Sequence, residues 1–358
     1  MEMRTGETRL HSVVHGGDVQ SFIEAYGYEP LDFSSNVSPL GVPETVVRAV
    51  QDAANRADAY PDRKCRLLRK ALAETEGVPP GRIVCGNGAA DLIWRLVLAY
   101  RPKQALLCAP CFGEYEAALR FVRTRINTVH LTEAFQLPDA FPEAVTKETD
   151  MVLLSQPNNP SGVPLQPDVL EKLVARCRET GTLLLIDECF MGFMEEPEAY
   201  SAKPFLANCP ALLVLNAFTK LYGMAGLRLG YLLCGSEDAA NRITETGQAW
   251  SVSNVAQAAG IAALRDTDYV TRVRSLVAKE RARLYEALCG MGFHVVQGKA
   301  NYLLLQSRTP LLLPLRERGI LIRACGDYKG LDDTRYRVAV RTEEENERLL
   351  AALREVVL

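Results

Sequence analysis

The chain has 358 residues, of which 48% are hydrophobic and 24% are charged, and its formal net charge at pH 7 is −3. This length and composition are typical of a soluble globular protein with one large domain and a smaller one. Acidic and basic residues are interleaved, which argues against a nucleic-acid surface but leaves room for a local basic site that binds a small anion. No apolar run approaches the ~20 residues needed to span a bilayer.

The N-terminal stretch "MEMRTGETRLHSVVHGGD" lacks the apolar segment of a signal peptide. We therefore expect a cytoplasmic protein whose ten scattered cysteines are reduced thiols. Cys108 and Cys111 have CxxC spacing, but neither a second pair nor a supporting histidine lies nearby in the sequence. We expect a structural role for this pair and no bound metal.

Between residues 82 and 234, short apolar runs alternate with longer amphipathic ones. The expected strands are 82–85, 105–108, 151–155, 182–187, 211–216 and 227–234, and the expected helices include 91–100, 114–122 and 168–179. This alternation is typical of a mostly parallel sheet covered by helices. The first part of the chain is therefore predicted to be an α/β domain.

After about residue 236 the pattern changes. A long helix is predicted over 272–290, followed by strands at 293–296, 301–306, 320–324 and 335–340. A last helix is predicted to begin at the capping box Thr342–Glu345. We divide the chain into an N-terminal arm (1–44) that joins the small domain, a large domain (45–240) and a small α+β domain (241–358).

Polar or glycine-rich residues follow the expected strands of the large domain. Gly86–Ala90, Phe112, Asn159, Asp187 and Lys220 each come at or soon after the carboxyl end of a strand, where the ligands of open parallel sheets bind. A glycine turn that enters a helix suits a phosphate, and an aromatic ring can cover an aromatic ligand. An asparagine can donate to a phenolate, a buried aspartate can hold a protonated ring nitrogen, and a lysine can form a Schiff base with an aldehyde. These groups are the attachment points that pyridoxal phosphate requires.

Three motifs carry a family resemblance: "NNPSG" with Asn159, "IDE" with Asp187, and "TKLYGMAGLRLGY" with Lys220 and Arg228. Together they resemble the fold-type I pyridoxal-phosphate enzymes, and specifically the class I and II aminotransferase family. The resemblance implies a seven-stranded, mostly parallel sheet with a smaller α+β domain. It also implies that the catalytic residues are Lys220, which carries the cofactor, and Asp187, which pairs with the pyridinium nitrogen.

The same resemblance implies a full set of cofactor contacts. They are Gly88, Ala89, Ala90, Phe112, Asn159, Asp187, Thr219, Lys220 and Arg228, with Tyr60 reaching the site of a neighbouring subunit in a homodimer. Two positions depart from the family pattern. Ala217 stands where many relatives have serine or threonine, and Phe190 stands where aminotransferases usually have tyrosine.

Two arginines in the predicted small domain indicate the kind of substrate. Arg337 matches the family arginine that binds an α-carboxylate, and Arg323 matches the arginine that histidinol-phosphate aminotransferases use for a phosphate. Arginine is rarely buried without a partner, so two of them on apolar strands indicate a substrate with two anionic ends. Arg341 is either a third positive charge at this site or a surface residue.

The N-terminal "HGGD" at 15–18 and "LDFSSNVSPLG" at 31–41 are similar to the L-threonine O-3-phosphate decarboxylases of cobalamin biosynthesis, and the likeness covers nearly the whole chain. In that group Phe190 fits the pattern. The positions implied to line the substrate pocket are His15, Gly16, Asn36, Asn159, Arg323 and Arg337. The implied reaction converts L-threonine O-3-phosphate to (R)-1-amino-2-propanol O-2-phosphate and carbon dioxide.

Other readings stay open at this point. L-Serine O-phosphate, which would give ethanolamine phosphate, differs by one methyl group, worth only ~1 to 3 kcal/mol of discrimination. A histidinol-phosphate aminotransferase would share the cofactor and both anion sites. A transcriptional regulator with an aminotransferase-like sensor is disfavoured, because we expect an N-terminal DNA-binding domain in such proteins and few residues precede "LDFSSN".

Overall fold

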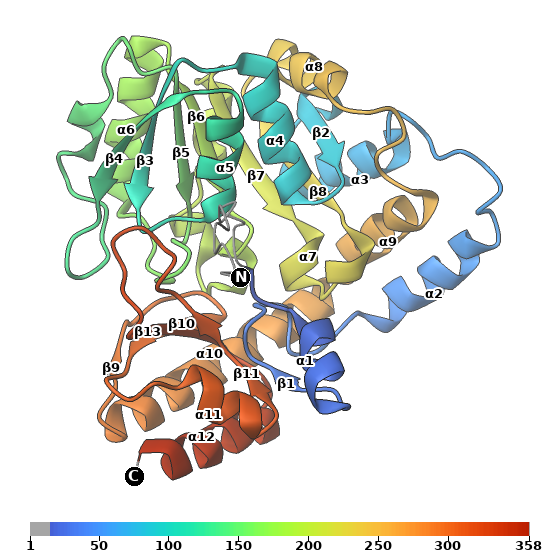
Figure 1. Ribbon diagram of the computed structural model, residues 1–358. Coiled ribbons are helices and arrows are strands. Elements are labelled where there is room, and N and C mark those ends of the chain that lie inside the picture. The colour runs from blue at the N-terminus through green and yellow to red at the C-terminus, as the bar shows by residue number, and fades with distance from the viewer. Residues whose placement is uncertain (1–14, 358) are drawn as a thin grey trace, which may run out of the picture.

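Seven strands form one mixed sheet in the computed structural model, which describes residues 15–357 (Figure 1). Their order is β2 (Ile83–Gly86), β8 (Gly230–Cys234), β7 (Leu212–Ala217), β6 (Leu183–Asp187), β5 (Met151–Ser155), β3 (Gln104–Ala109) and β4 (Arg125–His130). Strands β4, β3, β5, β6 and β7 are mutually parallel, and β8 is antiparallel to both of its neighbours. The predicted mostly parallel seven-stranded sheet is confirmed.

The register of the central strands brings their carboxyl ends to one edge of the sheet. Ser155 at the end of β5 is paired with Asp187 at the end of β6, and Ala217 at the end of β7 is paired with Gly230 of β8. Every residue of β5 and β6 is buried, as expected for parallel strands that are covered on both faces. The polar groups that follow these strands therefore share one edge.

Helices cover both faces of this sheet. One face packs against α3 (Arg66–Glu76), α6 (Pro167–Thr180) and α9 (Asn254–Arg265), and the other against α4 (Ala89–Tyr100), α5 (Gly113–Phe121) and α8 (Glu237–Thr246). Helix α2 (Glu44–Ala54) lies along α9 (Figure 1). The apolar stripe of each helix thus faces one of two continuous cores.

A second, antiparallel sheet lies below the first in Figure 1. Its order is β12 (Arg323–Ala324), β13 (Arg335–Ala339), β10 (Tyr302–Gln306) and β9 (His294–Val295). Helices α10 (Thr267–Gly290), α11 (Leu312–Glu317) and α12 (Glu343–Val357) pack on it around a separate core. The predicted capping box is confirmed, because the Glu345 N–H donates to Thr342 Oγ1 (3.4 Å) and the Thr342 N–H donates to Glu345 Oε2 (3.1 Å).

The N-terminal segment contains α1 (Val19–Tyr26) and β1 (Leu31–Asp32), and β1 pairs in parallel with β11 (Ile320–Leu321). The predicted arm also includes residues 1–14, which lie outside the described residues. The boundary predicted at residue 240 stays a prediction, but residue 240 lies inside α8, and both α8 and the following α9 pack on helices of the large domain. Small apolar residues of both helices, Ala239 and Ala240 of α8 and Ala256 and Ala259 of α9, are buried in the two cores of that sheet.

One strand of the large sheet, β4, was missing from the sequence-based prediction, as was the two-residue β1 of the N-terminal segment. The β4 residues "RINTVH" are exposed or half-buried along the whole strand, because β4 is the edge of the sheet. An edge strand carries no continuous apolar run, so its periodicity is weak. The remaining short elements are α7 (Phe218–Leu221) and 3₁₀ turns at Pro80–Arg82, Phe141–Ala144, Met191–Phe193, Pro197–Ala199, Lys203–Ala207 and Ala225–Leu227.

Across residues 15–357, no helix is long and apolar enough to cross a membrane. None of the ten cysteines forms a disulfide, and most of them are buried. The described part of the chain also contains no group of three or more histidine, cysteine, aspartate or glutamate side chains that could hold a metal ion.

Candidate active site

A cavity of about 660 Å³ lies where the carboxyl edge of the large sheet meets the N-terminal segment and the β12–β13 region. It is lined by most of the residues predicted for cofactor or substrate: His15, Gly16, Asn36, Ala89, Ala90, Phe112, Asn159, Asp187, Thr219, Lys220, Arg228, Arg323 and Arg337. Gly88 and Tyr60 are not among its lining residues. The fold therefore brings residues that are more than 320 positions apart in the sequence into one site.

Lys220 enters this cavity from α7, directly after β7. Its backbone carbonyl accepts a hydrogen bond from the Ser38 N–H (2.8 Å), and its Nζ lies 5.8 Å from the centre of the Phe190 ring. Burial lowers the pKa of the Lys220 ammonium to about 8, and the positive charge of Arg337 adds to this effect. The amine is therefore neutral in a substantial fraction of molecules near pH 8, as a nucleophile or proton carrier requires.

This pKa predicts how the cofactor-free protein should react with pyridoxal phosphate. Because only the neutral amine attacks an aldehyde, the rate of covalent attachment should rise as the pH increases through about 8 and level off above it. Arg337→Gln removes the second cause of the lowered pKa, so its rate curve should move to higher pH. Stopped-flow absorbance at a series of pH values measures both curves.

Arg341→Gln is the matched control for this measurement, because Arg341 is not among the groups that shift the pKa of Lys220. Its curve should coincide with that of the wild-type protein. An Arg337→Gln curve with an unchanged midpoint would show that the Arg337 charge does not act on Lys220.

Asp187 lies at the end of β6 and is 7% exposed. Its Oδ2 accepts a hydrogen bond from the Tyr115 hydroxyl (2.7 Å), and its Oδ1 accepts one from the Cys189 N–H (3.0 Å). Burial raises the pKa of the Asp187 carboxyl, and both hydrogen bonds oppose that rise. A cation placed beside Asp187 would favour its charged form, so this carboxylate suits a protonated ring nitrogen.

Tyr115 is a site residue that sequence reasoning missed. It lies on α5, three residues after Phe112, and it is completely buried. Its ring packs edge-on against Phe112, with 5.6 Å between ring centres. The i, i+3 spacing of two aromatic residues at the start of a helix was the available signal, because such residues share a face.

Tyr115→Phe should weaken cofactor binding while preserving the packing against Phe112. The hydroxyl donates to a buried carboxylate, and a hydrogen bond to a charged group is worth roughly 1.5 to 3 kcal/mol. We therefore expect an increase of about tenfold or more in the Kd for pyridoxal phosphate, measured by titration of the cofactor-free protein. A control at a tyrosine outside the cavity, Tyr100→Phe, should leave this Kd unchanged; an unchanged Kd for Tyr115→Phe would mean that its hydroxyl does not support Asp187.

One end of the cavity is built to hold an anion. Gly88 has φ +87° and precedes the first turn of α4, and a Cβ atom on Gly88 would lie 2.6 Å from Arg228 Nη2. Only glycine therefore allows the guanidinium of Arg228 to lie against the N-terminus of α4. Backbone N–H groups at a helix N-terminus and an adjacent guanidinium bind phosphate. Thr219, which is also buried, lines the cavity with them.

The middle of the cavity holds Phe112 and Asn159. The amide oxygen of Asn159 accepts a hydrogen bond from Arg337 Nη1 (2.6 Å), and the Asn159 N–H donates to Ser155 Oγ (3.0 Å). Since the oxygen is occupied by a donor, the NH₂ group of this amide is the part that can donate to a ligand oxygen. This orientation fits the predicted hydrogen bond to a phenolate.

Arg323 and Arg337 lie opposite each other on β12 and β13 and are both buried. Arg337 Nη2 donates to the Ser34 carbonyl (3.1 Å), and its buried Nε has no hydrogen-bond partner within residues 15–357. Arg323 forms an ion pair with Asp327 (2.7 Å) and lies 5.3 Å from the centre of the Tyr328 ring. The hydrogen-bond partners of Arg337 named here, Asn159 and the Ser34 carbonyl, are neutral. Arg323, in contrast, already pairs with a carboxylate of the protein.

Arg341 does not line the cavity. Its Nη1 donates to the Asp32 carbonyl (3.1 Å), and its Nη2 pairs with Glu345 (2.6 Å). This arginine therefore ties β1 to the first turn of α12. Neither reading that the sequence left open describes this residue: Arg341 lies outside the cavity, and its side chain is only 19% exposed.

The N-terminal segment closes one side of the cavity. Asn36 is 2% exposed, and its Oδ1 has no hydrogen-bond partner in the described part of the chain. Gly16 lies so close to the Ser34 carbonyl that any Cβ would clash with it. His15 Nε2 lies 2.9 Å from Glu114 Oε1, so this segment touches the large domain at the rim of the cavity.

Tyr60 lies outside this cavity and is 80% exposed. Its ring packs against Trp250, with 4.8 Å between ring centres. A residue in this position cannot contribute to the site of its own chain. Its predicted reach into a neighbouring subunit stays a prediction.

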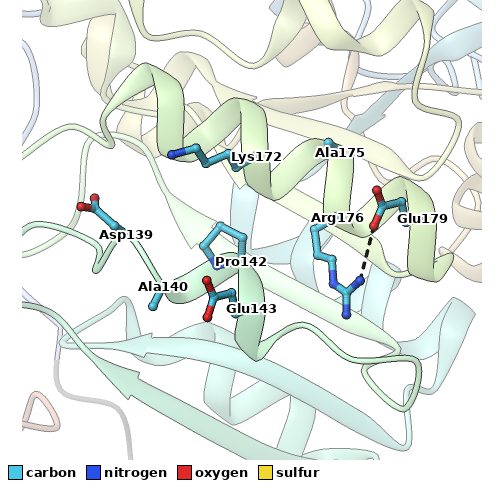
Figure 2. Close-up of a pocket in the computed structure, with 8 residues that line it drawn as sticks. All are labelled: Asp139, Ala140, Pro142, Glu143, Lys172, Ala175, Arg176 and Glu179. Carbon is cyan, nitrogen blue, oxygen red and sulfur yellow. Dashed lines mark hydrogen bonds and ion pairs between the residues drawn. The ribbon is translucent and has the colours of Figure 1, made fainter.

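A second hollow, of about 730 Å³, lies on the outer surface between the Phe141–Ala144 turn and α6 (Figure 2). Its charged side chains are Asp139, Glu143, Lys172, Arg176 and Glu179, and Arg176 pairs with Glu179 (3.3 Å). In Figure 2 the charged side chains lie apart from one another except for the Arg176–Glu179 pair, and none of the five is buried. We assign no function to this hollow.

Comparison with known proteins identifies the family. The family model for aminotransferase class I and II matches residues 28–353. The threonine-phosphate decarboxylase of Salmonella typhimurium is 38% identical over 97% of this chain and 98% of that protein. Histidinol-phosphate aminotransferase 2 of Carboxydothermus hydrogenoformans is 30% identical over 99% of both chains. The crystal structure of the histidinol-phosphate aminotransferase from Clostridium acetobutylicum superimposes with a TM-score of 0.86 at 28% identity, covering 90% of this chain and 98% of that one.

These findings agree with the cavity, in which a lysine, a buried aspartate and a helix N-terminus with an adjacent guanidinium converge. The resemblance inferred from the three sequence motifs is confirmed. The chain belongs to the aminotransferase class I and II family, and its cofactor is pyridoxal 5′-phosphate.

Proposed function

We propose that this enzyme decarboxylates L-threonine O-3-phosphate to (R)-1-amino-2-propanol O-2-phosphate and carbon dioxide, as a step of cobalamin biosynthesis. L-Serine O-phosphate is a close second substrate. It differs from L-threonine O-3-phosphate by one methyl group, which changes the free energy of binding by only ~1 to 3 kcal/mol. The observation that carries the proposal is the presence of two buried guanidinium groups, Arg323 and Arg337, in the same cavity as Lys220. A substrate with a phosphate at one end and a carboxylate at the other matches this pair of cations.

The cofactor would be held by the groups already described. Its phosphate would bind the N-terminus of α4 at Gly88, Ala89 and Ala90, together with Thr219 and Arg228. Phe112 would cover the ring, Asn159 would donate to its 3-hydroxyl oxygen, and Asp187 would keep the ring nitrogen protonated. When bound, the cofactor supplies an electron sink for the bond that breaks at Cα.

The remaining residues would decide which bond breaks. A bond to Cα is cleaved most readily when it lies perpendicular to the ring, so a decarboxylase must hold the carboxylate out of the ring plane. Arg337, whose Nε is buried without a partner in the described chain, would orient this carboxylate with Asn36. Arg323 would bind the substrate phosphate, in exchange for part of its ion pair with Asp327. Lys220, with a pKa of about 8, would return a proton to Cα after carbon dioxide leaves.

A histidinol-phosphate aminotransferase is the second candidate. Relatives of that name match this chain over nearly its full length. The identity to a threonine-phosphate decarboxylase is higher, at 38%, and the Phe190 ring, whose centre lies 5.8 Å from Lys220 Nζ, stands where an aminotransferase usually has a tyrosine. Both points favour the decarboxylase.

The decisive experiment compares the two reactions in the same preparation. Release of carbon dioxide from L-threonine O-3-phosphate is measured beside amino transfer from histidinol phosphate to 2-oxoglutarate. We expect carbon dioxide release at a turnover well above that of transamination. Efficient transamination without carbon dioxide release would refute the proposal. L-Serine O-phosphate in the same assay decides between the two phosphorylated amino acids.

A further inference from the structure

A chain of hydrogen bonds links the N-terminal segment to the large domain at the rim of the cavity. His15 Nε2 lies 2.9 Å from Glu114 Oε1, and the Trp94 Nε1–H donates to Glu114 Oε2 (2.9 Å). Both carboxylate oxygens of Glu114 are therefore engaged. Its side chain is 15% exposed, whereas that of His15 is 49% exposed.

Each member of this chain is fixed by its surroundings. Glu114 lies in the first turn of α5, where a negative charge is favourable. The hydrogen bond from His15 lowers the pKa of the Glu114 carboxyl, so this residue carries its charge at neutral pH. On the other side, the Gly17 N–H donates to Ser34 Oγ (2.7 Å), and Gly16 is packed against the Ser34 carbonyl. The two glycines that follow His15 are thus held against Ser34, while the His15 ring itself is held by Glu114.

The hydrogen-bond chemistry of imidazole then restricts the state of His15. A carboxylate only accepts hydrogen bonds, so Nε2 must carry a proton to bind Glu114. An anionic group of a ligand also only accepts, so Nδ1 must carry a second proton to bind it. A ring that binds both is an imidazolium ion, and a neighbouring negative charge is what stabilises that ion.

We propose that Glu114 is a positioning residue for His15: it engages Nε2 and balances the imidazolium charge, so that Nδ1–H is presented to an anionic group of the substrate. The inference rests on the proposed function in taking His15 as a substrate contact. It predicts that the charge of Glu114 matters as well as its shape. Glutamine has the same shape, and its amide oxygen can still accept from Nε2, but its NH₂ group would then face the Trp94 N–H, and it cannot balance the charge.

The test uses the holoenzyme and measures binding of L-threonine O-3-phosphate from the change in cofactor absorbance. Glu114→Gln should raise the Kd by about tenfold, which corresponds to the loss of one hydrogen bond to a charged group. The Tm should fall no further than it does in Trp94→Phe, and the cofactor spectrum without ligand should stay as in the wild-type protein. Trp94→Phe is the matched control, because it removes the other hydrogen bond of Glu114 without changing its charge, and its Kd should stay within about twofold.

A double-mutant cycle with His15→Phe decides whether Glu114 acts through His15. We expect His15→Phe to weaken binding to a similar extent and the double variant to bind no worse than His15→Phe alone, within about twofold. An unchanged Kd for Glu114→Gln would overturn the inference. A further tenfold loss in the double variant would also overturn it, because Glu114 would then act on the ligand directly.

The outcome can be separated from that of the proposed function. If the enzyme instead transaminates histidinol phosphate, the same variants are titrated with histidinol phosphate, which also carries a phosphate. A coupled loss with that ligand would support the role of Glu114 even though the decarboxylase proposal had failed. If the losses of affinity in Glu114→Gln and His15→Phe were additive with both ligands, the role of Glu114 would be refuted, and the proposed function would not be affected.

Discussion

Lys220→Ala should abolish covalent attachment of pyridoxal phosphate and lower turnover by about 10³-fold or more, the scale set by loss of a nucleophile and acid–base group. Lys220 lies in the cavity with a pKa lowered to about 8 by burial, so its amine can both attack an aldehyde and move a proton. Borohydride reduction of the wild-type holoenzyme should leave the cofactor on the peptide that contains Lys220. Mass spectrometry of the digested protein identifies that peptide.

Two other lysines provide the control. Lys64 and Lys299 do not line the cavity, and Lys299 Nζ donates to the Tyr200 hydroxyl (2.9 Å). Lys299→Ala should keep the cofactor and its absorbance band. Recovery of the label on either of these lysines, or a yellow Lys220→Ala protein with normal turnover, would exclude Lys220 as the attachment site.

Removal of either buried arginine should cost roughly 2 to 5 kcal/mol of substrate binding, because a charged partner is left desolvated and unpaired. The two variants should differ in what they lose. Arg323→Ala should bind phosphate-free L-threonine no worse than the wild-type protein does, while losing most of its preference for the phosphate ester. Arg337→Ala should lose affinity for the ligands that carry a carboxylate, with or without a phosphate.

Asp327 needs a control of its own, because Arg323→Ala leaves its carboxylate without the ion pair at 2.7 Å. The double variant Arg323→Ala with Asp327→Asn removes that isolated negative charge. If repulsion by Asp327 caused the loss, the double variant would regain phosphate affinity. If Arg323 binds the phosphate, the double variant should still lack the preference. Competition by L-threonine and L-threonine O-3-phosphate gives the ratio, and an unchanged ratio in both variants would remove Arg323 from the phosphate site.

The alternation of strands and helices and the order of the motifs can be read from the sequence. Central parallel strands are buried on both faces, so runs such as "MVLLS" and "TLLLID" must be apolar throughout and are readable without a structure. Asp187 and Lys220 could be identified because each ends or follows such a run, and the carboxyl ends of parallel strands meet at one edge. The capping box of α12 is local in sequence, so it too was readable.

Only the tertiary structure decided which distant residues share the site. Tyr115 supports Asp187 from 72 positions away, and Glu114 meets His15 across 99 positions. Such contacts depend on how the N-terminal segment and the helices pack, and no local periodicity encodes them. The different roles of Arg323, Arg337 and Arg341 could not be read from the sequence either, because all three lie in or just after similar apolar strands. What separates them is a carboxylate or carbonyl placed beside each by the fold: Asp327 for Arg323, Ser34 for Arg337, and Asp32 with Glu345 for Arg341.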